Sequence, residues 1–173
     1  MDLFEAVSKR HSYRNELDQA PLPLDDLRKI VQAGLDAPSG KNAQTTGFII
    51  IQDATIVEKI KGIPGAGGSM ATAPAYIACH ISKNPEKTYI GMSFEVEDCA
   101  AAVENILLAA TALGYATVWI DGWLRNVKRA QEIGKLCGLA EDRIIRILIP
   151  LGKALSEPEL KEKKPFEERV TIV

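Results

Sequence analysis

The sequence predicts a mixed α and β fold whose elements do not follow the order of a doubly wound sheet. Three observations lead to this prediction. Short β-branched runs lie between segments of helical periodicity, the connections are irregular, and the first predicted strand comes only after two helices. The chain has 173 residues, close to the roughly 150 residues of an average domain, so we expect one domain over residues 1–173.

The elements of the first half follow from periodicity and turn residues. Asp2 begins a short amphipathic helix that ends near Arg10, and Asp25 or Asp26 begins a second helix that the turn-rich stretch 37–42 ends. The next predicted elements are a buried strand over Gly47–Ile51, a short helix over Thr55–Lys61, a flexible glycine-rich stretch over Gly62–Ser69 and a strand over Ala75–Ile81.

The second half contains the longest predicted helix, from Phe94 to Leu113, with Gly114 as its left-handed cap. Most of its positions after Cys99 are small or apolar, which predicts burial in the domain centre or at a subunit interface. A strand over Thr117–Ile120, a helix over Asn126–Leu136 and a strand over Ile144–Leu151 follow. The charged tail ends in the apolar run Val170–Val173, which indicates packing on another subunit or a return to its own core.

Composition excludes several classes of protein. A formal net charge of −2 and 6% aromatic residues argue against a protein that coats nucleic acid. Three cysteines and two histidines without ligand spacing predict neither a disulfide framework nor a metal site. The N-terminus is acidic, and the apolar stretch 100–116 is interrupted by polar residues, so we expect no signal peptide, no membrane span and a cytoplasmic location.

The first candidate for a binding site is the segment Arg10-His11-Ser12-Tyr13-Arg14. In an extended segment alternate residues point the same way, so Arg10, Ser12 and Arg14 converge on one object in this interpretation. Two guanidinium groups and a hydroxyl are suitable donors for a phosphate dianion. The alternative is a basic helix C-terminus, solvated and favourable to the helix dipole.

Two further segments have the composition of a binding loop. Pro38-Ser39-Gly40-Lys41-Asn42-Ala43-Gln44 precedes a strand and presents backbone amides and small polar side chains; the alternative is an ordinary helix-to-strand connection. Ile120-Asp121-Gly122-Trp123 stands at the end of a strand, and its glycine allows a flat ligand to approach the backbone; the alternative is a plain strand-to-helix turn with Trp123 covering the core. No catalytic triad, Walker loop or dinucleotide fingerprint is present, and no acid–base pair stands out.

Taken in order, these segments resemble the nitroreductase family of flavin mononucleotide (FMN) enzymes. The resemblance also includes Glu97–Leu107 in the long helix, Trp119–Gly122, and Leu151-Gly152-Lys153, so it extends through nearly the whole chain. It implies an α+β fold, with a mixed or antiparallel central sheet flanked by helices, in an intertwined homodimer. The C-terminal arm, about residues 156–173, would then pack on the partner subunit.

The resemblance also implies a flavin site, with the chemistry carried by the flavin and with no catalytic side chain. The residues implied to bind the cofactor are Arg10, His11, Ser12 and Arg14 at the phosphate, Pro38, Ser39, Gly40 and Asn42 at the ring from the partner subunit, and Ile120, Asp121 and Gly122 near the flavin N5. Lys163 or Lys164 would add a cation at the phosphate. The glycine-rich Gly65–Ser69 stands where the family places pyrimidine-edge residues, without a clear match.

The implied activity is hydride transfer from NADH or NADPH through flavin N5 to a nitroaromatic, quinone or related small acceptor, in a ping-pong scheme. Two alternatives remain open at this stage. One is a flavin-binding carrier or sensor without turnover, and the other is an enzyme of the same fold that performs reductive dehalogenation or a ring-forming oxidation.

Overall fold

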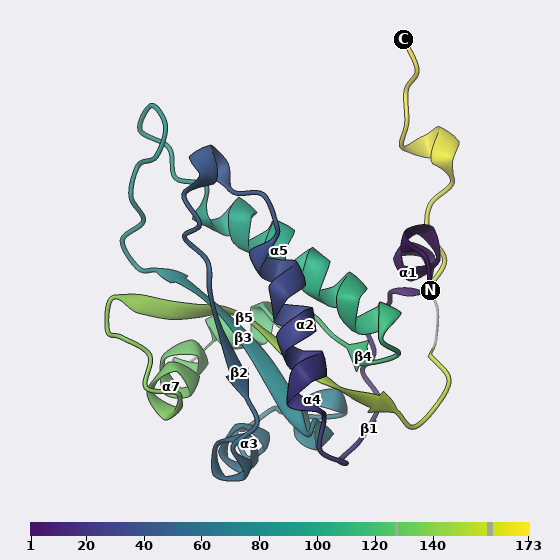
Figure 1. The fold of residues 1–173 in the computed structure, drawn as a ribbon, viewed down its shortest axis with the longest axis vertical. Coiled ribbons are helices and arrows are strands. Elements are labelled where there is room, and N and C mark those ends of the chain that lie inside the picture. The colour runs from purple at the N-terminus through teal and green to yellow at the C-terminus, as the bar shows by residue number, and fades with distance from the viewer. Residues whose placement is uncertain (127, 159–160) are drawn as a thin grey trace.

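The protein consists of a five-stranded sheet between two layers of helices (Figure 1). The computed structural model describes residues 1–126, 128–158 and 161–173. The described strands pair antiparallel in the order β1-β5-β3-β2, and β4 also pairs with β5. This architecture confirms the expected α+β class and the antiparallel central sheet.

The strands are β1 (Leu17–Asp18), β2 (Gly47–Ile51), β3 (Ala75–Ser82), β4 (Ala116–Thr117) and β5 (Arg143–Ala154). The α-helices are α1 (Leu3–Lys9), α2 (Leu24–Leu35), α3 (Ala54–Lys61), α4 (Ser69–Thr72), α5 (Glu95–Ala112), α6 (Gly122–Arg125) and α7 (Arg129–Leu136). Two 3₁₀ turns, η1 (Gly40–Asn42) and η2 (Phe166–Glu168), complete the set. None of the helices in this described part of the chain has the length and apolarity needed to cross a bilayer.

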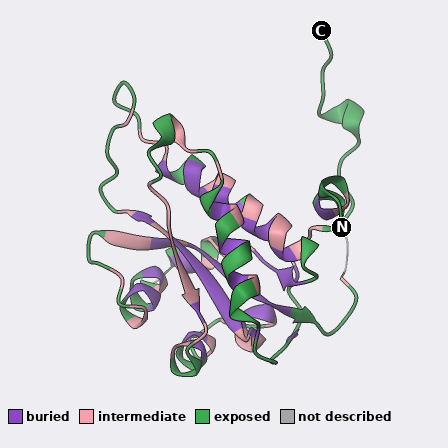
Figure 2. Ribbon diagram, viewed as in Figure 1, coloured by how far each residue is buried: buried purple, intermediate pink, exposed green. Residues whose placement is uncertain are grey.

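Strand β3 divides the interior into two cores because its side chains alternate between the two faces of the sheet. Its odd-numbered residues, such as Ile77 and Cys79, pack with α2 and α5. Its even-numbered residues Tyr76 and Ala78 pack on the other face, with α3, α4, α6 and α7. Buried positions line both sides of the central strands in Figure 2.

Helix α5 forms one side of the first core and ends as the sequence predicts. Acidic residues occupy its first turn, where the helix dipole favours negative charge. At its C-terminal end Gly114 has φ of 76°, and Tyr115 donates its backbone N–H to the carbonyl of Ala110. This left-handed cap turns the chain back toward the sheet at β4.

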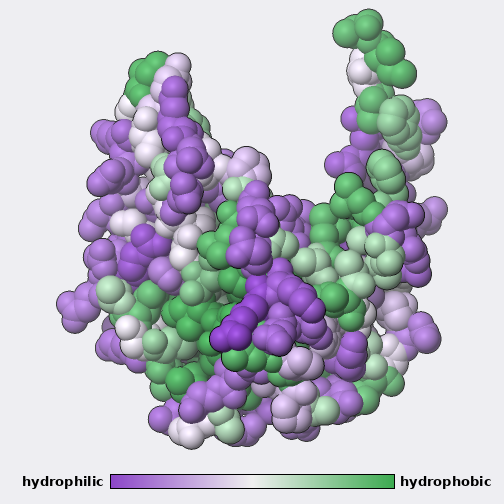
Figure 3. Space-filling view, in the orientation of Figure 1, coloured by the Kyte–Doolittle hydropathy of each residue, from purple (hydrophilic) through white to green (hydrophobic). Residues whose placement is uncertain are grey.

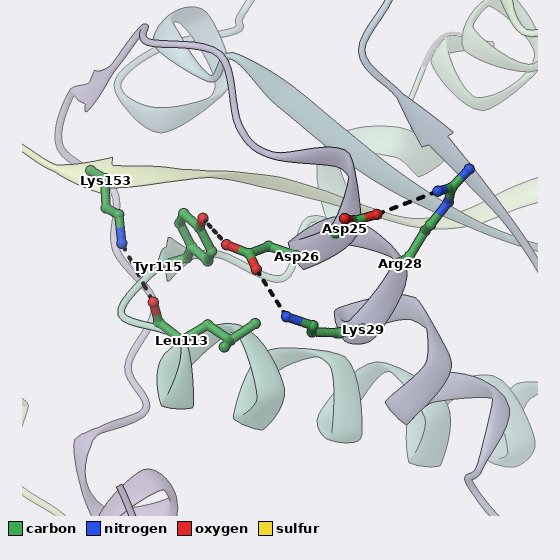
Figure 4. A network of polar contacts seen from close by, with 7 residues as sticks. All are labelled: Asp25, Asp26, Arg28, Lys29, Leu113, Tyr115 and Lys153. Atoms are coloured by element: carbon green, nitrogen blue, oxygen red, sulfur yellow. Dashed lines mark hydrogen bonds and ion pairs between the residues drawn. The ribbon is translucent and has the colours of Figure 1, made fainter.

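A small polar network holds the start of α2 against the end of α5 (Figure 4). The hydroxyl of Tyr115 donates to Oδ2 of Asp26 at 2.6 Å, and Lys29 lies 3.6 Å from the other oxygen of that carboxylate. The ammonium of Lys153, from β5, lies 4.0 Å from the Tyr115 ring centroid and donates to the carbonyl of Leu113. The network therefore joins α2, α5 and β5 at one end of the sheet.

Two predicted elements differ from the structure for identifiable reasons. The strand expected over 117–120 is reduced to β4 and an isolated bridge at Ile120, which exchanges two backbone hydrogen bonds with Leu148. Pro150 lies two residues further along β5, so its nitrogen faces the same edge and has no hydrogen to donate. The helix expected from 126 begins only at Arg129, after Lys128 with φ of 65°. Strand β1 was not expected.

Candidate functional site

The first candidate segment, residues 10–14, is held in place by the buried side chain of Tyr13. Its hydroxyl donates to the carbonyl of Glu16 and accepts the backbone N–H groups of Leu155 and Ser156, both at 3.2 Å. Its backbone N–H donates to the carbonyl of Thr117 at 2.8 Å. With Tyr13 directed inward, its neighbours Ser12 and Arg14 lie on the opposite side of the segment and line the surface, and His11 packs against Tyr13.

A hollow of about 150 Å³ lies at this surface. It is lined by residues 11–15 together with Pro158 and Lys161. The Nδ1 of His11 lies 2.8 Å from the carbonyl oxygen of Lys9, which only accepts, so Nδ1 carries the hydrogen. The other ring nitrogen, Nε2, is buried and has no hydrogen-bond partner among the described residues. The hollow therefore combines two cationic side chains, Arg14 and Lys161, with the hydroxyl of Ser12, a set suited to an anionic ligand.

Three of the predicted phosphate ligands lie apart from this hollow. The Arg10 Nε makes an ion pair with Glu104 of α5 at 3.3 Å, so its guanidinium is directed toward that helix. Lys163 is exposed, and Lys164 lies 3.8 Å from Glu168 within the arm. The lysine that lines the hollow is Lys161. The predicted convergence of Arg10, Ser12 and Arg14 remains a prediction about the ligand-bound protein.

The glycine-rich stretch 65–69 supports the backbone of the same segment. Gly68 has φ of 51°, and any Cβ at this position would overlap the carbonyl oxygen of Arg14. The backbone N–H of Ser69 donates to that same oxygen at 3.3 Å. Only glycine combines a positive φ with the absence of a Cβ, so Gly68 allows this stretch to pack closely against the backbone of Arg14.

The second candidate segment is the loop 38–44, which rests on the N-terminal turn of α5. Oδ1 of Asp98 accepts the backbone N–H of Gly40 at 2.8 Å, and a Cβ at Gly40 would collide with the ring of Phe94. Lys41, Asn42 and Gln44 all have positive φ, between 51° and 55°. The loop is thus strained locally and held by a buried carboxylate, an arrangement frequent at ligand-binding sites.

A hollow of about 110 Å³ lies beside this loop. Its lining includes Pro38, Ser39, Gln44 and Asp98, and two threonines, Thr45 and Thr46, whose buried hydroxyls have no partner among the described residues. It shares no lining residue with the hollow at residues 11–15. The structure therefore does not bring the first two candidate segments into one pocket within a single chain.

The third candidate segment, residues 120–122, lies against the edge of β5 that faces away from β3. Ile120 is fixed there by its two hydrogen bonds with Leu148, each 3.0 Å. Gly122 is exposed, and a Cβ there would meet no atom within 4 Å, so its packing leaves space for a flat ligand. Asp121 pairs with two arginines, Arg125 and Arg146.

Sequence reasoning missed the residues that hold these segments. Asp98 lies in the first turn of α5, where an acid needs no further role, and its bond to Gly40 spans 58 positions of the chain. Tyr13 was part of the motif, but nothing local showed that residues 155 and 156 would bind it. Arg146 lies in a strand and gave no signal. Each of these roles depends on a partner that is distant in sequence.

The chain is similar to nitroreductases along almost its whole length. The Nitroreductase family model matches residues 7–66 and 63–153. A protein of Archaeoglobus fulgidus named as an NADH dehydrogenase/NAD(P)H nitroreductase is 31% identical over 80% of this chain and 78% of its own. One of the same name from Methanothermobacter thermautotrophicus is 32% identical over 94% of this chain and 82% of its own.

A solved structure agrees with these relatives. The nitroreductase of Bacteroides fragilis, crystallised with FMN, superposes with a TM-score of 0.80 and 25% identity, covering 100% of this chain and 99% of that one. The segments 10–14, 38–44 and 120–122 all fall within the residues that the family model matches. The chain is a member of the nitroreductase family.

Proposed function

We propose that the protein is an FMN-dependent oxidoreductase that passes hydride from NADH or NADPH to a nitroaromatic, a quinone or a related small acceptor, in a ping-pong scheme. FMN is the cofactor of the related B. fragilis structure, and the archaeal relatives are named for NAD(P)H. The observation that carries the proposal is the hollow at residues 11–15, which combines the cations of Arg14 and Lys161 with the hydroxyl of Ser12.

The residues present fit a flavin mononucleotide. Arg14, Lys161 and the hydroxyl of Ser12 supply donors for the phosphate, and His11 lines the same hollow. In the proposal Arg10 joins this set by exchanging its ion pair with Glu104 for the phosphate, and Lys163 or Lys164 joins it by movement of the arm. At the opposite end of the cofactor from the phosphate, the open space at Gly122 admits the flavin ring against the backbone of 120–122.

The complete site is proposed to require two subunits. Ligand pockets measure about 300–1,000 Å³, whereas the hollows beside residues 11–15 and 38–44 measure about 150 and 110 Å³ and are separate. A homodimer in which Pro38, Ser39, Gly40 and Asn42 of one subunit face the phosphate segment of the other would join them. Exposed apolar residues on α1 and the C-terminal arm, including Phe4, Phe166 and Ile172, support such an interface (Figure 3).

When bound, the flavin supplies the hydride-transfer chemistry. The role of the chain is to orient the cofactor and to hold charges beside it. The phosphate segment anchors one end through cations, the loop 38–44 supports the ring, and the backbone of 120–122 faces the N5 edge. No side chain is assigned as an acid or a base, so the site needs no proton donor with a shifted pKa.

The decisive experiment is a visible spectrum of the purified protein reconstituted with FMN, followed by anaerobic addition of NADPH or NADH. Bleaching of the flavin bands supports the proposal, and the faster donor identifies the preferred nicotinamide. Bound flavin that neither donor bleaches would favour a carrier or sensor instead. A protein that takes up no FMN would contradict the proposal.

A variant tests the phosphate segment directly. Replacing Arg14 by Met should raise the Kd for FMN at least tenfold, because a hydrogen bond to a charged group contributes about 1.5–3 kcal/mol and about 1.4 kcal/mol corresponds to a tenfold change in affinity. Fluorescence quenching of FMN measures the Kd. Arg28→Met is the matched control, since Arg28 is exposed on α2 and pairs only with Asp25 among the described residues. An R14M affinity equal to that of R28M would remove Arg14 from the site.

A further inference from the structure

Asp121 is bound by two guanidinium groups that come from different parts of the fold. Arg125, one turn further along α6, makes two parallel hydrogen bonds to its carboxylate, both 2.7 Å. Arg146 of β5 donates to Oδ1 at 2.5 Å. Burial alone would raise the pKa of the Asp121 carboxyl, but its hydrogen bonds and charge contacts with the two arginines outweigh burial and hold that pKa below its usual value.

Arg146 reaches Asp121 because of an irregularity in the sheet. Along the β3–β5 ladder Cys79 pairs with Ile147 and His80 with Ile145, so Arg146 is the extra residue of a β-bulge. A bulge re-aims a side chain and is frequent beside active sites. Here it directs a long cation to the edge of the sheet where β5 also binds the backbone of Ile120. One strand therefore holds consecutive residues, Ile120 by its main chain and Asp121 by a side chain.

The three charged side chains of this cluster differ in their exposure to solvent. The Arg146 side chain is 19% exposed and that of Asp121 is 24%, whereas the Arg125 side chain is 61% exposed. Water and salt screen an exposed charge much more than a half-buried one. The effect of Arg146 on a neighbouring ligand is therefore larger than that of Arg125, and together they reverse the sign of the charge that Asp121 alone would present.

We propose that Arg146 is a positioning residue of the flavin site, which fixes Asp121 and the 120–122 backbone and makes this edge of the site positive. The inference rests on the proposed function, in which that backbone faces the N5 edge of the ring. A positive charge near this edge raises the reduction potential of the flavin, since reduction adds negative charge to the ring system. With Arg146 the cluster carries a net positive charge and favours reduction; without it the remaining Asp121–Arg125 pair carries no net charge, and that support for reduction is lost.

The test is the midpoint potential of the FMN-loaded protein, measured by dye equilibration, with the FMN Kd of each variant as a second readout. Arg146→Met should shift the reduction equilibrium at least tenfold against reduction, which lowers the potential by about 30 mV for a two-electron couple. Arg125→Met should give a smaller shift of the same sign. Arg146→Lys retains the charge and should remain within threefold of the wild-type equilibrium.

Asp121→Asn should change the midpoint potential in the opposite direction, and this test does not depend on whether R146M folds. It should shift the equilibrium toward reduction, and combined with R146M it should restore a potential close to that of the wild type, because both charges are then absent. R146M and R146K shifting alike, or D121N lowering the potential, would overturn the inference. These results are distinct from failure of the proposed function, in which the wild-type protein takes up no FMN.

Discussion

Strand β3 and the pair formed by α1 and the C-terminal arm are both rich in apolar residues, yet the chain covers only the first. Every residue of β3 from Ala75 to Cys79 is completely buried. On α1, by contrast, Phe4 is 83% exposed, and Ile172 in the arm is 86% exposed. Figure 1 shows the arm extending away from the body of the protein, and Figure 3 shows apolar residues on it.

The difference lies in the number of layers that each element contacts. Strand β3 lies between two helix layers, so both faces of its alternating pattern are covered. Helix α1 lies at the margin and buries only Ala6 among its residues, leaving Leu3, Phe4 and Val7 exposed. Apolar residues in the first region stabilise the folded chain, and those in the second are available to another copy of it.

The largest expected effect is on stability and concerns the covered region. Ile77→Ala should lower the free energy of unfolding by about 2–5 kcal/mol, because it removes three carbon atoms from the centre of a packed core. Urea unfolding measures the change. The control is Ile172→Ala, which should change the free energy by less than about 0.5 kcal/mol at low protein concentration. Equal losses in the two variants would contradict the comparison.

A smaller effect is expected on association and concerns the exposed region. Phe4→Ser should raise the dimer dissociation constant by about tenfold or more, since burying a phenylalanine contributes about 1.5–3 kcal/mol. Sedimentation velocity over a dilution series measures the constant. The helical content of the F4S monomer should match that of the wild type by circular dichroism. A wild-type protein that stays monomeric at high concentration would leave the apolar face of α1 without the proposed partner.

The smallest effect concerns His80, the half-buried polar residue near the end of β3. Burial first, and then the positive charge of Arg143, lower its pKa in the folded protein. The Nε of Arg143 donates to its Nδ1 at 3.0 Å, which requires that nitrogen to be without hydrogen. Neutral His80 therefore stabilises the folded protein, because the unfolded chain binds a proton at this histidine more readily. This stabilisation is complete above the unfolded pKa of about 6.5, and it is lost as the pH falls from there through the lower pKa of the folded protein.

Replacing His80 by Gln removes this titration. The wild-type midpoint of thermal unfolding should fall more steeply than that of His80→Gln between pH 7 and 5, while other acid-sensitive groups act equally in both. A parallel pH dependence of the two proteins would show that the histidine has the same proton affinity in the folded and unfolded states.

The local sequence pattern was sufficient to predict an element wherever the residues of that segment alone determine its conformation. Gly47–Ile51 is a strand within the bounds that its β-branched run predicts, and Gly114 has the positive φ of the helix cap expected there. Local pattern failed where a neighbour decides the outcome. Pro150 shortens the strand opposite it, and the glycine-rich stretch that looked flexible is packed against the carbonyl of Arg14. The bulge that turns Arg146 toward Asp121 leaves no trace in the order of residues.

The sequence by itself determined the α+β class, most of the helices and strands, and the family to which the chain belongs. Periodicity, turn residues and short motifs are local properties, and they are readable without the fold. The tertiary structure alone decided that Asp98 holds Gly40, that Lys161 lies nearer the hollow than Lys163 or Lys164, and that Arg146 binds Asp121. These contacts join segments distant in sequence, and the packing of the whole chain selects them.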